Sequence, residues 1–139
     1  MIAVSVDLQR QFGSARDQGP RPTCLAFAAS DAHAAKRSAW SPLSCEFAFF
    51  HAQRRAKQPP TSGASLASML EAIRQDGQPV ESRWPYLPAT PPNLATWKPP
   101  VRCGPLFHRS GATSHPAVAE IIAALNTGQP VIVMMVPST

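Results

Sequence analysis

Cys24 and Gln18 are the residues whose types and spacing could do chemistry. From Cys24 to about Ala39 there is neither Gly nor Pro, so a helix is expected to begin at or next to Cys24, with Thr23 as its N-cap. Unpaired N–H groups and the positive end of the helix dipole favour the thiolate, which is the nucleophilic form. The Gln18 amide, looped back over the helix start, would form a two-donor hole for an oxyanion together with the Cys24 N–H. The pair predicts acyl transfer through a thiol; the alternative is a cysteine that only packs in the core.

The remaining cysteines and the histidines do not extend this site. The three cysteines, at positions 24, 45 and 103, include no CxxC pair and match no zinc pattern. An odd number leaves at least one thiol free, which fits a reducing compartment. His33 lies nine residues along the same expected helix, roughly 13 Å from Cys24. None of the four histidines (His33, His51, His108 and His115) is expected to act as a base, and no metal or organic cofactor is implied.

Composition sets the class of protein in which this site is expected. The 139 residues suit one ordinary domain, with 44% hydrophobic and 15% charged residues and a net charge of +5. No apolar run approaches the roughly 20 residues needed to cross a bilayer, and residues 1–13 do not resemble a signal peptide, so a cytoplasmic location is expected. The only dense basic cluster (Arg54, Arg55 and Lys57) is typical of a solvated helix end, so neither a nucleic acid nor a membrane is expected as a partner.

The elements that position the site are expected to be mainly helical. Proline and glycine divide the chain into blocks, and apolar residues recur at helical spacing within them. Helices are expected over about 24–39, over about 44–57, over a third segment carrying Leu66, Met69, Leu70 and Ile73 and ending at Gly77, and over a fourth that follows His115-Pro116, carries Val118, Ile121, Ile122 and Leu125, and closes at Gly128. Residues 78–113 are expected to be irregular.

One strand is expected, over Pro130–Val136, because this run is apolar and rich in β-branched residues. A lone strand leaves two edges of unpaired backbone groups, and residues 1–12, in which Ile2, Val4 and Val6 alternate, could pair with only one of them. The chain is therefore expected to end inside a sheet, with an exposed edge through which a second copy could dimerise.

The order of these landmarks resembles the papain family of cysteine peptidases. In that family Asp/Asn-Gln-Gly precedes a helix that starts at the nucleophilic Cys, with the same Gln-to-Cys separation of six residues. Further similar segments follow in order: Leu43-Ser44 before a helix, Ser62-Gly63-Ala64 where the family has a double glycine, Gly77 through Trp84-Pro85-Tyr86, and Gln129-Pro130-Val131-Ile132-Val133. The resemblance covers nearly the whole chain and is weakest over residues 87–115.

The resemblance implies an α+β papain-like fold and assigns roles to four residues. Cys24 would be the nucleophile and Gln18 an oxyanion donor, and the backbone at Gly63 and Ala64 would pair with an extended peptide substrate. Residues 1–113 would form the helical, nucleophile-bearing domain, and residues 114–139 the beginning of an incomplete β-rich domain.

Three substitutions depart from the family pattern. Arg21 stands where the family has a half-cystine, so the disulfide at that point is absent, in keeping with a cytoplasmic or bacterial-type member. Leu25 replaces the indole that normally packs near the catalytic pair, and Ala64 replaces the second glycine.

The catalytic histidine and asparagine of the family are the largest difference. They lie about 130–150 residues after the cysteine, which is position 154 or later here, beyond Thr139. One hypothesis is therefore a fragment of a peptidase, inactive alone, whose missing C-terminal segment or a second chain supplies the histidine and asparagine. The alternatives are an inactive pseudo-peptidase that binds peptides or proteins, and a plain structural or interaction module.

Overall fold

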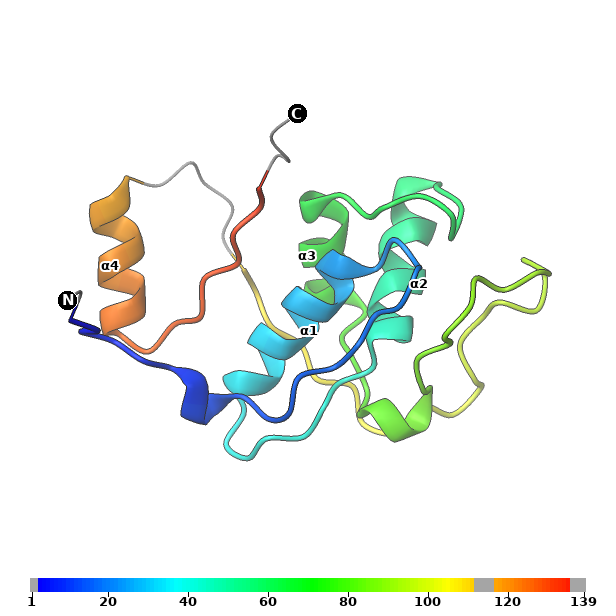
Figure 1. The fold of residues 1–139 in the computed structure, drawn as a ribbon. Coiled ribbons are helices and arrows are strands. Elements are labelled where there is room, and N and C mark those ends of the chain that lie inside the picture. Colours follow the sequence, from blue (N-terminus) through cyan, green and yellow to red (C-terminus); the bar gives the residue numbers. More distant parts are fainter. Residues whose placement is uncertain (1–2, 112–116, 136–139) are drawn as a thin grey trace.

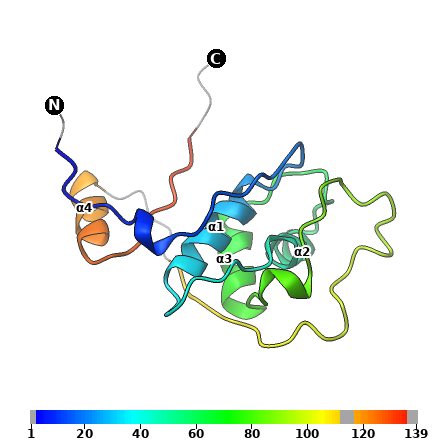
Figure 2. The same ribbon diagram turned by 60° about the horizontal axis from the view of Figure 1, so that its bottom comes forward.

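A computed structural model describes residues 3–111 and 117–135 of the chain. Three helices, α1, α2 and α3, pack against one another, and α4 stands to one side of them (Figures 1 and 2). The elements in chain order are η1 (Gln9–Gln11), α1 (Cys24–Ala35), α2 (Cys45–Ala56), α3 (Leu66–Gln75), η2 (Glu81–Arg83) and α4 (Val118–Asn126). The three-helix unit carries the candidate site, because α1 begins at Cys24.

Local sequence sets the ends of α2 and α3. Ser44 Oγ accepts a hydrogen bond from the Phe47 N–H at 3.1 Å, and Ser65 Oγ accepts one from the Ser68 N–H at 3.2 Å, so each helix has a side-chain N-cap. Gly77 follows α3 with φ +73°, and a Cβ there would lie 2.9 Å from the Phe107 carbonyl oxygen. Glycine is therefore required at the turn that leaves α3. The helix expected at about 44–57 and the third expected helix, which ends at Gly77, are confirmed.

The core lies between the three helices and is closed by two tryptophans from the later, irregular segment. It contains alanines and phenylalanines of α1 and α2, apolar residues of α3, and the indoles of Trp84 and Trp97. Phe50 meets both indoles, with ring centroids 5.7 Å from Trp84 and 5.1 Å from Trp97. Aromatic packing of this kind stabilises the fold beyond simple area burial, by about 0.5–1.5 kcal/mol per pair. Residues 84–97 are thus fixed on the helical unit although they form no long helix or strand.

Helix α1 begins at Cys24 as expected, but its C-terminal end and its N-terminal capping differ from the prediction. It ends at Ala35, four residues short of the prediction. Thr23 is the N-cap residue, yet its side chain makes no cap hydrogen bond and its Oγ1 lies 2.8 Å from the Tyr86 hydroxyl instead. The capping role expected of the Thr23 side chain is wrong, because a tertiary partner takes the hydroxyl.

The strand expected over Pro130–Val136 is absent in residues 130–135; Val136 lies outside the described residues. Residues 3–8 are not a strand either. A strand exists only through backbone pairing, and within the described residues the only β-type pairs are isolated bridges, Leu43 with Val80 and Gln78 with Phe107. The fold is therefore mainly helical, and the α+β prediction holds only for its helical part.

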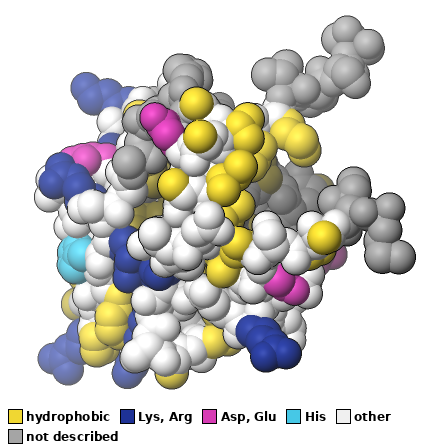
Figure 3. Space-filling view, turned by 90° about the vertical axis from the view of Figure 1, so that its left-hand side faces the viewer, with side chains coloured by type: hydrophobic (Ala, Val, Ile, Leu, Met, Phe, Trp, Pro, Cys, Tyr) yellow, Lys and Arg dark blue, Asp and Glu magenta, His cyan; other side chains and the backbone are white. Residues whose placement is uncertain are grey.

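The described segment after residue 117 carries several exposed apolar side chains, although Ile132 is half-buried against the core. Helix α4 has no buried residue, and Val118, Val133 and Met135 are 71%, 70% and 85% exposed. Figure 3 shows hydrophobic side chains gathered on this face of the molecule. The helix expected here is confirmed over Val118–Asn126; the expected opening at His115-Pro116 lies outside the described residues. No helix in the described part of the chain is long and apolar enough to cross a membrane.

Candidate active site

Cys24 is exposed at the first residue of α1, whereas Cys45 is buried and Cys103 lies between these extremes. Within residues 3–111 and 117–135 no hydrogen bond reaches its sulfur. The next residue, Leu25, is buried in the core, where it anchors the first turn of the helix. The thiol is thus held at the surface by a rigid element, and it is open to a reagent or substrate.

Gln18 lies on the loop that returns to the start of α1. Gly19 has φ +63°, and its N–H donates to Asp17 Oδ1 at 2.8 Å, so an Asx turn and a glycine set the sharp return. The Gln18 side-chain amide donates to the Arg21 carbonyl oxygen at 2.9 Å. A primary amide has two N–H bonds, so this contact fixes the side chain and leaves a second donor.

Tyr86 ties this loop to the helical unit. Its hydroxyl donates to the Gln18 carbonyl oxygen at 2.6 Å, so the Thr23 hydroxyl must donate to Tyr86 in the 2.8 Å contact between them. The ring packs edge-on against Phe27 of α1 at 4.7 Å between centroids. Tyr86 therefore holds Gln18 and the residue before Cys24 at once, a role that the sequence analysis did not find.

Arg21 enters the interior beside the same loop and forms an ion pair with Glu46 of α2. The two side chains are 1% and 0% exposed, and Arg21 Nη1 lies 2.7 Å from Glu46 Oε2. From the sequence, Arg21 is notable only because it stands where the resembling family has a half-cystine. A buried glutamate and arginine 25 residues apart carry no sequence signal that links them.

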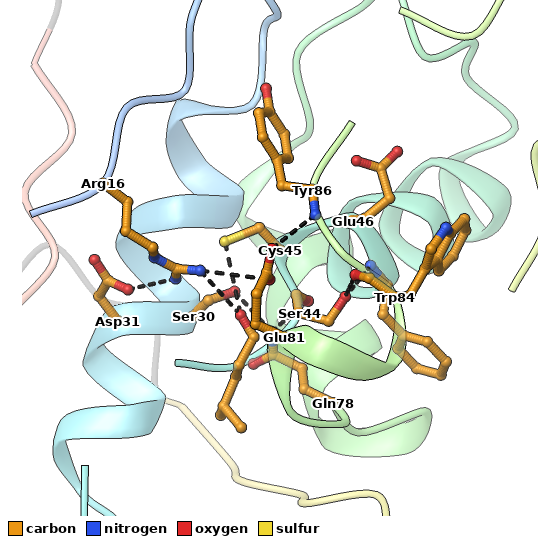
Figure 4. A network of polar contacts seen from close by, with 12 residues as sticks. Arg16, Ser30, Asp31, Ser44, Cys45, Glu46, Gln78, Glu81, Trp84 and Tyr86 are labelled. Carbon is orange, nitrogen blue, oxygen red and sulfur yellow. Dashed lines mark hydrogen bonds and ion pairs between the residues drawn. The ribbon is translucent and has the colours of Figure 1, made fainter. Parts of the chain in front are cut away.

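A second polar network joins the lead-in segment to α1, α2 and η2 (Figure 4). Arg16 pairs with Asp31 of α1, donates to the Leu43 carbonyl at 3.2 Å, and lies 3.5 Å from Glu81 Oε2. Burial raises the pKa of Glu81, although the Tyr86 N–H donates to its Oε1 at 2.7 Å. Burial also raises the pKa of the neighbouring Cys45 thiol to about 12, so Cys45 stays protonated and unreactive at neutral pH.

The described histidines have partners of their own. His33 Nδ1 lies 2.9 Å from Gln78 Oε1, and Gln78 Nε2 donates to Ser30 Oγ at 2.6 Å. His51 Nδ1 accepts from Arg54 Nε at 3.1 Å and lies 3.6 Å from Asp76 Oδ1. An amide and a carboxylate from segments distant in sequence therefore lie beside these two rings, and the positions of the histidines along the chain do not indicate these partners.

These contacts place the described histidines in structural roles. Burial lowers the pKa of both His33 and His51, so each is neutral at neutral pH. His108 Nδ1 lies 3.0 Å from the Arg74 carbonyl oxygen, and His115 lies outside the described residues. Of the basic cluster, Arg54 and Arg55 pair with Asp76 at 3.1 and 2.7 Å instead of being merely solvated.

Gly63 and Ala64 lie on the loop between α2 and α3. Two hydrogen bonds from Gln53 Nε2, to the carbonyl oxygens of Pro59 and Ser62, fix this loop. In Figures 1 and 2 it passes on the same side of the helical unit as the N-terminal end of α1. Gly63 is exposed, and nothing lies within 4 Å of where a Cβ would stand, so its backbone is open to a ligand.

An open hollow of the described residues lies elsewhere. An open hollow of about 550 Å³ lies between α2 and the proline-rich segment 99–106, and its lining includes Phe47, His51 and Cys103 but not Cys24. Because Arg54 donates to His51 Nδ1, the neutral ring carries its proton on Nε2 and cannot accept one there from Cys103. The candidate site is therefore the open surface at Cys24 and not this hollow. No group of three or more metal-ligating side chains occurs in the described parts of the chain.

Comparison with known proteins agrees with this fold. No family model and no curated protein sequence matches the chain. Among solved structures, the chain is similar to one described as the structural basis for limited antibody cross-reactivity between the mite allergens Blo t 1 and Der p 1, which are of the papain-like cysteine protease family. The TM-score is 0.68 at 20% identity, over 86% of this chain and 41% of that chain. The likeness shows that these residues share the fold of part of a papain-like protein, and that they span less than half of its length.

Proposed function

We propose that this chain is the nucleophile-bearing part of a papain-like cysteine peptidase, with Cys24 as the nucleophile and Gln18 as an oxyanion donor. The observation that carries the proposal is the exposed Cys24 at the first residue of α1, with the Gln18 loop fixed immediately beside the helix start. A papain-like fold under this geometry supports it. An extended peptide pairing with the backbone at Gly63 and Ala64 is the substrate that the open loop favours.

In the proposed reaction the Cys24 thiolate attacks the carbonyl carbon of a peptide bond, and the π electrons of that bond move to the oxygen. The second N–H of Gln18 and the Cys24 backbone N–H would bind this oxyanion. Collapse of the intermediate expels the amine, which takes up the proton that left the thiol, and water then releases the acyl group from sulfur. We propose that the histidine and asparagine that move and orient this proton come from polypeptide beyond these 139 residues or from a second chain, since His33, His51 and His108 have other partners.

Selective labelling tests the nucleophile. We expect a peptidyl chloromethyl ketone to alkylate Cys24 faster than Cys103, and not to label Cys45, as followed by mass spectrometry of the intact and digested protein. Cys103 is the matched control, because burial raises the pKa of its thiol while leaving it partly accessible. Equal rates at Cys24 and Cys103 would contradict the proposal. We expect no turnover of an unstructured peptide by this chain alone; turnover that disappears in Cys24→Ala would show that the base lies within it.

The second candidate is an inactive papain-like module that binds peptides or proteins. It is favoured by the absence of a histidine contact to Cys24 among the described residues and by the exposed apolar side chains of α4 and residues 133–135. This face is also where a second copy or a further segment would bury apolar area. Peptide binding that is unchanged in Cys24→Ala, together with unselective labelling, would favour this function over the first.

A further inference from the structure

Arg21 is a deeply buried charge near the candidate site. It lies three residues before Cys24 and is 2% exposed as a residue. Its guanidinium meets the Glu46 carboxylate side by side, with Nη1 to Oε2 at 2.7 Å and Nη2 to Oε1 at 3.1 Å. This bidentate geometry fixes both distance and orientation between the Cys24 loop and α2.

The carboxylate of Glu46 has no acceptor capacity left. Besides the two bonds from Arg21 it accepts the Leu87 N–H at 3.1 Å and the Trp97 Nε1–H at 2.8 Å. An ionised carboxylate offers about four acceptor positions, and all four are used here by donors. A glutamine at position 46 would turn an NH₂ group toward one of these donors, so the site requires a carboxylate.

The guanidinium of Arg21 has further contacts, although its Nε has no hydrogen-bond partner among the described residues. Nη1 also donates to the Leu87 carbonyl oxygen at 2.7 Å. The group lies over the rings of Tyr86 and Phe49, at 5.0 and 5.6 Å from their centroids. Lysine at position 21 could supply the charge but not the paired bonds or the planar stacking.

The backbone of Arg21 carries this anchoring to both proposed oxyanion donors. Its carbonyl oxygen accepts from the Gln18 side-chain amide at 2.9 Å and from the Thr23 N–H at 2.9 Å. Gln18 is the first proposed donor, and Thr23 directly precedes Cys24, whose N–H is the second. A shift of Arg21 would therefore displace both the Gln18 amide and the residue that precedes Cys24.

We propose that Arg21 is a positioning residue, and that its ion pair with Glu46, a carboxylate also bonded by the Trp97 indole, is a buried, non-covalent cross-link that holds the oxyanion donors at Cys24. The inference rests on the proposed function and deepens it. Arg21 stands at the position where the resembling family has a half-cystine, so the ion pair holds the loop without a disulfide. Unlike a disulfide, this link does not depend on the redox state of the compartment.

The experiment measures how well a peptide aldehyde protects Cys24 of the full chain from iodoacetamide. The thiol adds to the aldehyde carbon, the proton passes to the aldehyde oxygen, and the resulting hemithioacetal oxygen lies where the oxyanion would. Iodoacetamide alkylation itself needs no oxyanion donor, so its rate without aldehyde reports only the accessibility and ionisation of the thiol. The ratio of the alkylation rates without and with aldehyde therefore reports the contribution of the oxyanion donors.

Four variants separate the roles. Gln18→Ala removes a donor and is expected to weaken aldehyde protection about tenfold, which is the worth of one good hydrogen bond. Arg21→Met is expected to weaken protection to the same extent. The double variant Arg21→Met with Glu46→Gln is expected to do the same, and it removes the buried, unpaired carboxylate that the single variant leaves. Arg21→Lys is expected to recover part of it. Ile73→Ala, a buried position on α3 away from the loop, lowers stability without touching the donors and is expected to leave protection unchanged.

Hydrogen exchange on the same variants locates the effect. In the Arg21 variants the amides of residues 19–24 are expected to exchange faster while those of α3 are unchanged, and this arm reads out even where protection is weak. Arg21 variants that protect like the wild type, while Gln18→Ala does not, would overturn the positioning role and leave the proposed function intact. Equal protection in wild type and Gln18→Ala, or none in either, would overturn the proposed function and this inference with it.

Discussion

Replacing Tyr86 by phenylalanine tests whether the Tyr86 hydroxyl holds the loop that precedes the candidate nucleophile. The change keeps the ring, its edge contact with Phe27 and its face toward Arg21, and deletes only the hydroxyl. Two hydrogen bonds are lost, to the Gln18 carbonyl at 2.6 Å and from the Thr23 hydroxyl at 2.8 Å. Any effect therefore reports on the loop and not on the packing of the ring.

The expected cost follows from the burial of the two partners. Thr23 is 1% exposed, so its hydroxyl loses its partner out of reach of water, at about 1–2 kcal/mol. Gln18 is half-buried and its carbonyl can turn to solvent, which adds about 0.5 kcal/mol. We expect a loss near 2 kcal/mol in urea unfolding, or a fall in Tm of about 4–8 °C for a domain of this size.

A double-mutant cycle with Thr23→Val provides the control. Once the Tyr86 hydroxyl is gone, removing the Thr23 hydroxyl should cost little more, so the coupling energy is expected to be about 1 kcal/mol. Amides of residues 19–24 are expected to exchange faster in Tyr86→Phe while those of α2 do not. A stability change below about 0.5 kcal/mol with unchanged amide exchange would refute this role of the Tyr86 hydroxyl.

Two further predictions concern the scaffold. Burial lowers the pKa of His33, so as the pH decreases the imidazole of the unfolded chain is protonated before that of the folded chain. The free energy of unfolding therefore decreases as the pH is lowered from about 6.5 to the lower pKa of the folded state. His51 contributes in the same window, so the measurement is the difference in unfolding free energy between wild type and His33→Gln from pH 7 to pH 5; an unchanged slope would contradict this account. Ser44→Ala removes an N-cap and the bond from Ser44 Oγ to the Trp84 carbonyl at 2.7 Å, and should cost about 2–3 kcal/mol, whereas the exposed cap variant Ser65→Ala should cost about 1 kcal/mol or less. Equal losses in the two denaturation curves would show that the Trp84 bond contributes nothing.

The local features of the candidate site could be predicted because their causes are local. A run without Gly or Pro beginning at Cys24, the serine before α2 and the apolar spacing of α3 each act within a few residues, and the helices follow them. The prediction of a strand over residues 130–135 was wrong because the cause of a strand is not local. β-branched residues favour extended backbone, but a strand requires a partner, and within the described residues none pairs with this segment.

The sequence by itself determined that a cysteine would begin a helix after a tight Gly-Pro return carrying a glutamine, and the structure decided that this cysteine is exposed. Only the tertiary structure decided how that return is held. Tyr86 meets Gln18 across 68 residues, Trp97 meets Glu46 across 51, and His33 meets Gln78 across 45. Such polar pairs are selected by burial, since a buried donor or acceptor must find a partner wherever the fold brings one near, and sequence spacing does not record that proximity.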